Sequence, residues 1–553
     1  MTVCIQYAKP SSGQGEGEVY GLDVAVDNFL SAWFKYGRQE KFVCLPVDFP
    51  SFDHFKELAK AQGVDAEKRC IGLDPRTPKN NLEGMGCIFR PDPLTTNIIW
   101  RRQQLKGRGY AACGLVHTMS GERIARAVGE LLLAPAGPGD ALICPSASIR
   151  DAVQNLWGIY TDYLNHHFNG QYRTPIETPV IPLGTDTEKY AARATPEKRT
   201  MQRAALQIAD DEVVILFLGR LSFATKAHPL ALWQAVEHAA KLTRKKIRVV
   251  MFGYFKPKDM EQHFTALAKD IFKTARVDFV MNDDPRFPEG FWAGADIFAS
   301  LSDSVQESFG LTPVEAMAAG LPVIVSDWNG YRGGVRDGQE GFLIPTFTPP
   351  PENGLAIAEH YYNEQNYGVA LVGASQSTLV DINRCAAAVH MLVEDEAKRK
   401  QMGENARARA RDVFDWRHII KAYEDLWAEL ERKHQNAAIQ PGTPQNWQAA
   451  HPAFPNPWAM FSSFPSGFLA PSDKFRVVLG NNEINQLLRH EMNFFTAELL
   501  LPKELLLSII EVIRNAGTPT INDIVTSFPA EEHGRVWRSL GWAFKLGICE
   551  RIP

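Results

Sequence analysis

The 553-residue sequence lacks several features that would assign it to a function class at once. Its eight cysteines are scattered and include no Cys-x-x-Cys pair, so the sequence indicates neither a zinc site nor a disulfide framework. No apolar run is long enough to span a bilayer, and residues 1–7 are too few and too polar for a signal peptide. These absences favour a cytoplasmic protein with reduced thiols and at most peripheral contact with a membrane.

The sequence also has little excess of charge of either sign. The formal net charge is -5, which is small for this length, so no global basic character favours a nucleic-acid partner. Apolar residues make up 45% of the chain and can fill sizeable cores, and the length predicts more than one domain.

The strongest local signal lies at residues 302–326, where Glu307 and Glu315 flank a turn that leads into a helix. Thr312 is predicted to cap this helix, with Glu315 as the glutamate of a capping box, and Gly320 to end it. Free backbone N–H groups and the positive helix end then suit an anion such as a diphosphate. The alternative is that Glu315 is only a cap and Glu307 only a solvated loop carboxylate.

A basic pair follows the continuous apolar run at residues 213–219, which is typical of a buried parallel strand. Arg220 comes directly after the run and Lys226 six residues later. Arginine binds phosphate oxygens in a fork and lysine acts as a point charge, so the pair suits a diphosphate. Two solvated surface cations are the alternative.

Strands and helices alternate along the chain, which predicts doubly wound parallel sheets. His117 stands at the end of one predicted strand, where ligands of such sheets gather, although a structural histidine is an equal alternative. A glycine-rich loop at residues 11–21 follows the first strand. Strands are predicted at residues 2–7, 42–46, 86–89, 114–117, 141–144, 213–219, 247–252, 276–281 and 296–300, and helices at 22–36, 121–133, 148–156, 230–242, 260–272, 290–293 and 413–433.

The segment with Glu307, Phe-Gly-Leu, Glu315 and the run Glu-Ala-Met-Ala-x-Gly-x-Pro-Val resembles the donor-site signature of retaining glycosyltransferase family 4, the glycosyl transferases group 1. Gly-Arg-Leu before Lys226 is similar to the diphosphate-binding pattern of that family. The resemblance covers about residues 1–435. It implies an α/β GT-B fold, in which two Rossmann-like, doubly wound parallel-sheet domains face a cleft.

The resemblance also implies roles. Glu307 would hold sugar hydroxyls, Glu315 the ribose hydroxyls, and His117 the sugar from the opposite domain, while Arg220 and Lys226 would stabilise the leaving diphosphate. The usual Gly-Gly pair of the first loop is missing, and Gly17 and Gly21 are its nearest equivalents. The further donor contacts implied are Phe309, Gly310, Leu311, Thr312, Met281 and Gly17.

We expect an N-terminal acceptor domain at residues 1–185, a nucleotide-sugar domain at 186–411, and a helix at 412–435 that packs back on the first domain. A linker rich in proline and aromatic residues follows at 436–472, and a small, mostly helical, winged-helix-like domain at 473–553. Basic and acidic residues are equally numerous from residue 502 onwards, which is unfavourable for DNA binding and favours a protein partner.

The sequence therefore predicts a retaining glycosyltransferase that moves a sugar from a nucleotide-diphosphate donor to an acceptor hydroxyl in polysaccharide or glycoconjugate synthesis. We expect neither a metal nor a cofactor, a UDP-sugar as the first candidate donor, and a carbohydrate, lipid-linked or protein acceptor. The alternatives are a GT-B nucleotide-sugar epimerase or hydrolase, and an inactive GT-B scaffold that acts through its C-terminal module.

Overall fold

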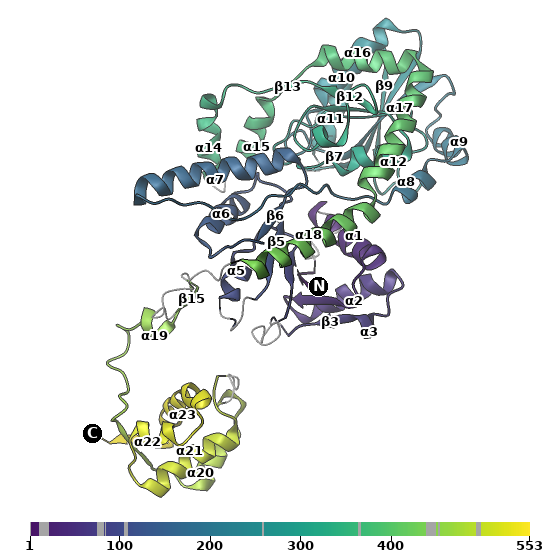
Figure 1. Ribbon diagram of the computed structural model, residues 1–553. Helices are drawn as coiled ribbons and strands as arrows, with labels where there is room; N and C mark the ends of the chain where they lie inside the picture. The colour runs from purple at the N-terminus through teal and green to yellow at the C-terminus, as the bar shows by residue number, and fades with distance from the viewer. Residues whose placement is uncertain are drawn as a thin grey trace. The chain divides into compact units, whose positions relative to one another are not determined.

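The computed structural model describes residues 2–9, 21–74, 82, 84–103, 105, 109–256, 259–362, 367–437, 449–451, 454–493 and 499–552. The chain divides into two compact units, Met1–Ala453 and Phe454–Pro553 (Figure 1). The predicted contact Gly17 lies outside the described residues.

The first sheet has six parallel strands in the order β3-β2-β1-β4-β5-β6. Its central strands are apolar and buried on both faces, as parallel strands between helices are. The strands are β1 (Val3–Tyr7), β2 (Phe42–Pro46), β3 (Cys70–Gly72), β4 (Cys87–Arg90), β5 (Ala111–Leu115) and β6 (Ala141–Ile143). The main helices around it are α1 (Gly21–Tyr36), α2 (Phe49–Ala61), α5 (Thr96–Arg102), α6 (Glu122–Glu130) and α7 (Ala147–Phe168).

The second sheet repeats this arrangement, with six parallel strands in the order β12-β11-β10-β7-β8-β9. In both sheets the first strand therefore lies between the second and the fourth, which is the Rossmann order. The strands are β7 (Glu212–Leu221), β8 (Lys246–Phe255), β9 (Arg276–Met281), β10 (Ile297–Ser300), β11 (Val323–Ser326) and β12 (Gly341–Ile344). The helices are α8 (Thr187–Arg193), α9 (Pro196–Ala205), α10 (Pro229–Leu242), α11 (Met260–Ile271), α12 (Leu311–Ala319), α16 (Ile382–Glu394) and α17 (Glu396–Arg409).

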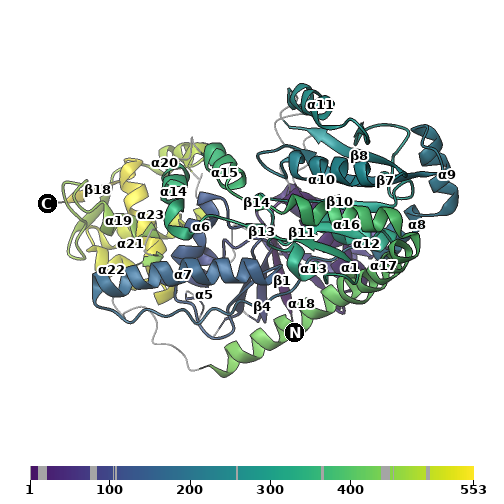
Figure 2. The same ribbon diagram turned by 90° about the horizontal axis from the view of Figure 1, so that it is seen from above.

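Helix α18 (Trp416–Asn436) returns to the first sheet and lies beside α1 (Figure 1, Figure 2). Its aromatic side chains are buried there: the Tyr423 ring lies 4.9 Å from that of Phe29, and the Trp427 ring 5.2 Å from that of Phe89. The aromatic stripe of this helix is thus part of the core. The helix begins later than predicted because Asp415 caps it by accepting the backbone N–H of Arg417.

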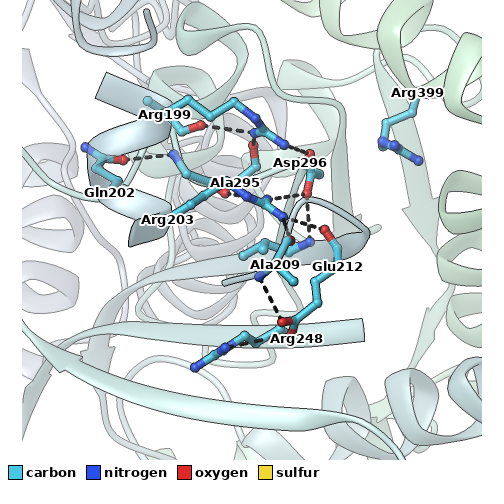
Figure 3. Close-up of polar contacts among 12 residues, drawn as sticks. Arg199, Gln202, Arg203, Ala209, Glu212, Arg248, Ala295, Asp296 and Arg399 are labelled. Atoms are coloured by element: carbon cyan, nitrogen blue, oxygen red, sulfur yellow. Dashed lines mark hydrogen bonds and ion pairs between the residues drawn. The ribbon is translucent and has the colours of Figure 1, made fainter. Parts of the chain in front are cut away.

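A buried ionic network fastens α9 to the amino-terminal edge of the second sheet (Figure 3). Asp296 pairs with Arg199 at 2.6 Å and with Arg203 at 3.3 Å, and it also accepts the backbone N–H of Val214 at 2.8 Å. Arg203 in turn donates to the backbone oxygen of Glu212 at 2.8 Å. The network pairs the charged groups at the amino-terminal edge, whereas ligands of such sheets bind at the opposite, carboxyl edge.

Some predicted elements differ from the structure. Residues 290–293 form turns and no helix, because Gly290 has a φ of 85°. The strand predicted at 114–117 lies earlier, at Ala111–Leu115, and the helix predicted at 148–156 continues to Phe168. An unpredicted pair of helices, α14 (Leu355–Tyr362) and α15 (Tyr367–Gln376), is inserted between the paired strands β13 (Thr346–Phe347) and β14 (Leu379–Val380).

The unit Phe454–Pro553 has its own apolar core, which includes Phe475, Ile509 and Leu540. Four α-helices of the described residues lie between a strand that was not foreseen and the final strand with which it pairs, in keeping with the mostly helical domain that the sequence predicts. The elements are β17 (Lys474–Val477), α20 (Asn481–Leu487), α21 (Lys503–Ala516), α22 (Ile521–Thr526), α23 (His533–Lys545) and β18 (Cys549–Ile552), with β17 and β18 antiparallel. The winged-helix assignment stays a prediction.

Within the described residues, no helix is both long and apolar enough to cross a membrane.

Candidate functional site

The candidate site lies at the carboxyl ends of β7 and β10, which are neighbours in the second sheet. The strand order reverses at this pair: β8 and β9 follow on one side of β7, and β11 and β12 follow on the other side of β10. Ligands of open α/β sheets bind at such a switch point. The loop after β7 carries Lys226, and the loop after β10 carries Glu307. The two segments singled out from the sequence therefore meet at one edge.

Lys226 and Glu307 form an ion pair at this edge. Lys226 Nζ lies 2.7 Å from Glu307 Oε2, and the two side chains are only 16% and 12% exposed. Burial disfavours both charges, but their mutual attraction outweighs it, so the pKa of Glu307 is lowered and that of Lys226 is raised. The pair is therefore fully charged at neutral pH, and each partner fixes the position of the other.

Two further groups hold the Glu307 side chain. The backbone N–H of Ser308 donates to Oε1 at 3.3 Å, and the hydroxyl of Tyr331 donates to Oε2 at 3.3 Å. The Tyr331 hydroxyl also lies 3.0 Å from that of Ser300, and burial raises the pKa of Tyr331 to about 12. Tyr331 thus stays protonated, and it orients the carboxylate without adding charge.

Glycines allow β7 and β8 to approach each other closely beside the basic segment. A Cβ on Gly253 would lie 1.8 Å from the backbone oxygen of Gly219 on the neighbouring strand, so no larger residue fits. β7 extends to Leu221, so Arg220 lies within the strand and not in the loop after it, as the sequence had suggested. The Arg220 guanidinium donates to the backbone oxygen of Thr225 at 3.3 Å, next to Lys226.

The start of α12 differs from the prediction. The cap is Gly310, with a φ of 97°, and not Thr312, which lies in the first turn of the helix. A Cβ on Gly310 would lie 2.2 Å from the Tyr331 ring, so both the backbone conformation and the close packing select glycine. The Thr312 hydroxyl is buried and has no hydrogen-bond partner among the described residues. The predicted end of the helix at Gly320, with a φ of 87°, is confirmed.

Glu315 consequently makes no capping box and turns towards α8. Its Oε1 accepts the hydroxyl proton of Tyr190 at 2.7 Å. Burial raises the pKa of Glu315, and the Tyr190 hydrogen bond partly offsets this. Glu315, Leu311 and Tyr190 line a small cavity together with Asn28 of α1. The second carboxylate thus lines a cavity to which both halves of the unit contribute, and it is separate from the hydrogen bond between Lys226 and Glu307.

His117 lies two residues beyond β5 of the first sheet. Its Nε2 is 3.0 Å from the backbone oxygen of Pro91, and burial lowers the pKa of His117 to about 4. The imidazole is therefore neutral at pH 7, with the proton on Nε2 for this hydrogen bond and Nδ1 left as an acceptor. A neutral acceptor suits a ligand hydroxyl.

The first domain touches the Glu307 loop directly. Ser146 caps α7 by accepting the N–H of Ile149, and its hydroxyl donates to the backbone oxygen of Ser308 at 2.9 Å. Ser148 donates to the backbone oxygen of Asn329 at 3.1 Å, and the Asn329 amide donates to the backbone oxygen of Glu307. The start of α7 in the first domain is therefore hydrogen-bonded to the loop that carries Glu307 and to the neighbouring Asn329 turn of the second domain.

The side chains of the remaining predicted donor contacts, Phe309 and Met281, pack into the core, so only their backbone groups could contact a ligand. The Phe309 side chain is buried, with its ring 5.9 Å from that of Phe414, so it faces the core. Met281 ends β9 and packs against the core of the second sheet. Sequence reasoning missed Tyr331 and Tyr190, although the turn before Tyr331, with Asn329 and Gly330, was a visible signal of special backbone geometry.

A cavity of about 1100 Å³ opens beside the site, between the first domain and the segment around α14. Ser120 and Val305 line it, and each lies within three residues of His117 or Glu307. Among the described residues there is no cluster of three or more His, Cys, Asp or Glu side chains arranged for a metal ion.

Comparison with known proteins agrees with this geometry. Residues 198–350 match the family model described as Glycosyl transferases group 1, and this range includes Arg220, Lys226, Glu307 and Glu315. A D-inositol 3-phosphate glycosyltransferase of Nocardia farcinica (strain IFM 10152) is 28% identical over 225 residues, which are 40% of this chain and 45% of the relative. The enzyme of the same name from Xylanimonas cellulosilytica is 27% identical over 464 residues, which are 77% of this chain and 96% of the relative.

The chain spans less than half the length of the first curated relatives that it matches, for example 45% of the Nocardia enzyme. The crystal structure of Anabaena HepE in complex with UDP superimposes with a TM-score of 0.51 at 16% identity and covers 78% of this chain and 100% of its own. This likeness concerns the fold.

Two six-stranded sheets of Rossmann order, with the candidate site where their domains meet, define a protein of the GT-B fold. The matched segment, residues 198–350, carries the ion pair and both carboxylates of that site, and it is similar to the glycosyl transferases group 1 family.

Proposed function

We propose that the protein is a retaining glycosyltransferase that moves a sugar from a nucleotide-diphosphate donor to an acceptor hydroxyl. The observation that carries the proposal is the buried Lys226–Glu307 pair, 2.7 Å long, at the switch point of the second sheet. The match of residues 198–350 to the glycosyl transferases group 1 family model supports it.

Arg220 and Lys226 stabilise the diphosphate as it leaves, together with N–H groups at the start of α12. In the reaction the bond between the anomeric carbon and the diphosphate oxygen breaks, and the bonding electrons go to that oxygen. The acceptor hydroxyl attacks the same face of the sugar, and its proton passes to the departing diphosphate. The protein contributes position and fixed charge at the atoms where negative charge develops.

The other polar groups hold the donor. Glu307, kept charged by Lys226, accepts hydrogen bonds from sugar hydroxyls. Glu315 accepts those of the ribose, beside the Tyr190 hydroxyl that already orients it. His117 contributes the neutral Nδ1 from the first domain. Besides supplying positive charge for the diphosphate, Lys226 thus holds the Glu307 carboxylate in a position to bind the sugar.

The donor is proposed to be a UDP-sugar, because HepE is solved with UDP and shares the fold. We propose a metal-independent reaction without a cofactor, since Arg220 and Lys226 supply positive charge where a metal ion would otherwise act. The relatives are named for D-inositol 3-phosphate, and a carbohydrate acceptor is proposed for this chain.

The finer predictions from the sequence stay with this proposal. The reaction is assigned to the cytoplasm, where nucleotide sugars are at hand. Residues 473–553 are assigned to contact with a protein and not to nucleic acid, because basic and acidic residues are equally numerous from residue 502 onwards.

The test begins with a thermal-shift screen of the full chain against UDP-, GDP- and ADP-sugars, since a bound donor raises the melting temperature. Turnover of the donor that binds is then followed by NMR, which resolves the anomeric configuration of the product. The proposal expects nucleotide release with retention in the wild-type chain and none in Glu307→Gln. Product formed with water as the sole acceptor supports the hydrolase, and a chain that binds no donor supports the scaffold.

A further inference from the structure

The large cavity of about 1100 Å³ lies beside segments that flank the reaction site. It is lined by Ser120, three residues after His117, and by Val305, two residues before Glu307. It is also lined by Phe347 and by residues of α14. Arg220, Lys226 and Glu315 do not line it, so the groups assigned to the nucleotide lie elsewhere.

Aromatic side chains from both domains form its walls: Tyr160 of α7, Trp328 after β11, Phe347 of β13 and Tyr361 of α14. The Trp328 indole N–H donates to the backbone oxygen of Ser304 at 3.0 Å, which fixes the orientation of that ring. Serine, threonine and asparagine residues are also part of the lining. Sugar rings need this combination, because their C–H faces pack on aromatic rings while their hydroxyls need hydrogen-bond partners.

Both arginines in the wall are already compensated. Arg332 pairs with Asp327 at 2.7 Å, and Arg126 pairs with Glu122. A third acid, Glu130, lines the cavity as well, so acids outnumber the two arginines. Such a wall does not attract a phosphate, and it suits a neutral ligand.

The inserted helices contact residues that neighbour His117 and Glu307 in the chain. The hydroxyl of Tyr367 in α15 lies 3.1 Å from Ser120 Oγ of the first domain and accepts the Gln306 amide of the second at 3.0 Å. The Tyr367 ring lies 6.0 Å from that of Tyr361, which lines the cavity. Figure 1 and Figure 2 both show α14 and α15 near α6 and α7. The helix pair, which the sequence did not predict, is thus a wall shared by both domains.

We propose that this cavity is the acceptor site and that it takes a neutral oligosaccharide of at least two sugar rings, with its reacting hydroxyl between Ser120 and Val305. This inference rests on the proposed function and names its acceptor class. The volume of about 1100 Å³ is slightly above the range of about 300–1,000 Å³ usual for ligand pockets, so a single ring leaves most of it empty.

The test uses the full chain with saturating UDP on an array of defined neutral and anionic glycans, with inositol 3-phosphate as a competitor in solution. Ala358→Trp fills the cavity from α14, where Ala358 is exposed and the fold tolerates a large side chain. Ala356→Trp is the matched control, since Ala356 is exposed on the same helix and does not line the cavity.

We expect the wild-type chain to bind neutral glycans of two or more rings, and Ala358→Trp to weaken this binding by at least about tenfold, or 1.4 kcal/mol. Ala356→Trp should bind as the wild type does, and all three proteins should show the same melting shift with UDP. The inference is overturned if no neutral glycan binds, if Ala358→Trp binds normally, or if inositol 3-phosphate displaces the glycan at the same site. A chain that does not respond to any nucleotide sugar contradicts the proposed function instead, so the two failures are distinguishable.

Discussion

The Lys226–Glu307 pair permits a quantitative prediction about the site. Lys226→Met leaves the Glu307 carboxylate charged in a position that is only 12% exposed, and Glu307→Gln leaves the Lys226 ammonium in one that is 16% exposed. Removing one partner of a buried pair costs about 3–5 kcal/mol, because the other charge loses its compensation. The double variant removes both charges, so its cost should be well below the sum of the two single costs.

The assay is a double-mutant cycle of urea unfolding on the full chain at neutral pH, with the wild type and the three variants. We expect a coupling energy of about 3 kcal/mol between the two substitutions. Arg220→Met, combined with Glu307→Gln, is the control pair of substitutions. Its coupling energy should be much smaller, because no hydrogen bond joins Arg220 to Glu307 among the contacts of the described residues. Costs that simply add would refute the argument that each charge holds the other in place.

Three further predictions concern the surroundings of the pair. Burial raises the pKa of Asp303 to about 6, so its charged form opposes folding above that pH; Asp303→Asn should raise stability by about 1–3 kcal/mol at pH 8 but not near pH 4, and an equal gain at both values contradicts this. The pKa of His117 is lowered from 6.5 to about 4, so the unfolded chain takes up this proton first; stability should fall as pH falls from 6.5 towards 4, and His117→Gln should flatten that slope in melting curves. Gly310→Ala should lower the melting temperature and the turnover together, since its Cβ meets the Tyr331 ring at 2.2 Å, while Gly333→Ala, which meets nothing within 4 Å, should change neither.

Much of the fold follows from local sequence patterns. The strands Phe42–Pro46 and Arg276–Met281 lie where the apolar runs predict them, because a short buried strand between turn residues has few alternatives. The alternation of strands and helices likewise gives the parallel sheets. The inserted pair α14 and α15 was not foreseen, since the apolar residues of α15 do not favour one side of the helix strongly.

The site was only partly predictable for a different reason. Lys226 and Glu307 stood out by their setting in the chain, but their ion pair joins residues 81 positions apart. Tyr190 reaches Glu315 across 125 positions, and Tyr331 reaches Glu307 across 24. No local pattern predicts such contacts. The capping prediction for Thr312 failed because the left-handed conformation of Gly310 starts the helix two residues earlier than a threonine cap allows.

The most direct test of the account is a crystal structure of the full chain with UDP. The account predicts diphosphate oxygens within hydrogen-bond distance of Arg220 and Lys226, about 2.7–3.2 Å, with the ribose hydroxyls on Glu315. It also predicts that the cavity beside Trp328 and Tyr361 stays free of the nucleotide. UDP bound in that cavity, or a diphosphate out of reach of Lys226, would contradict the assignment of both the donor site and the acceptor site.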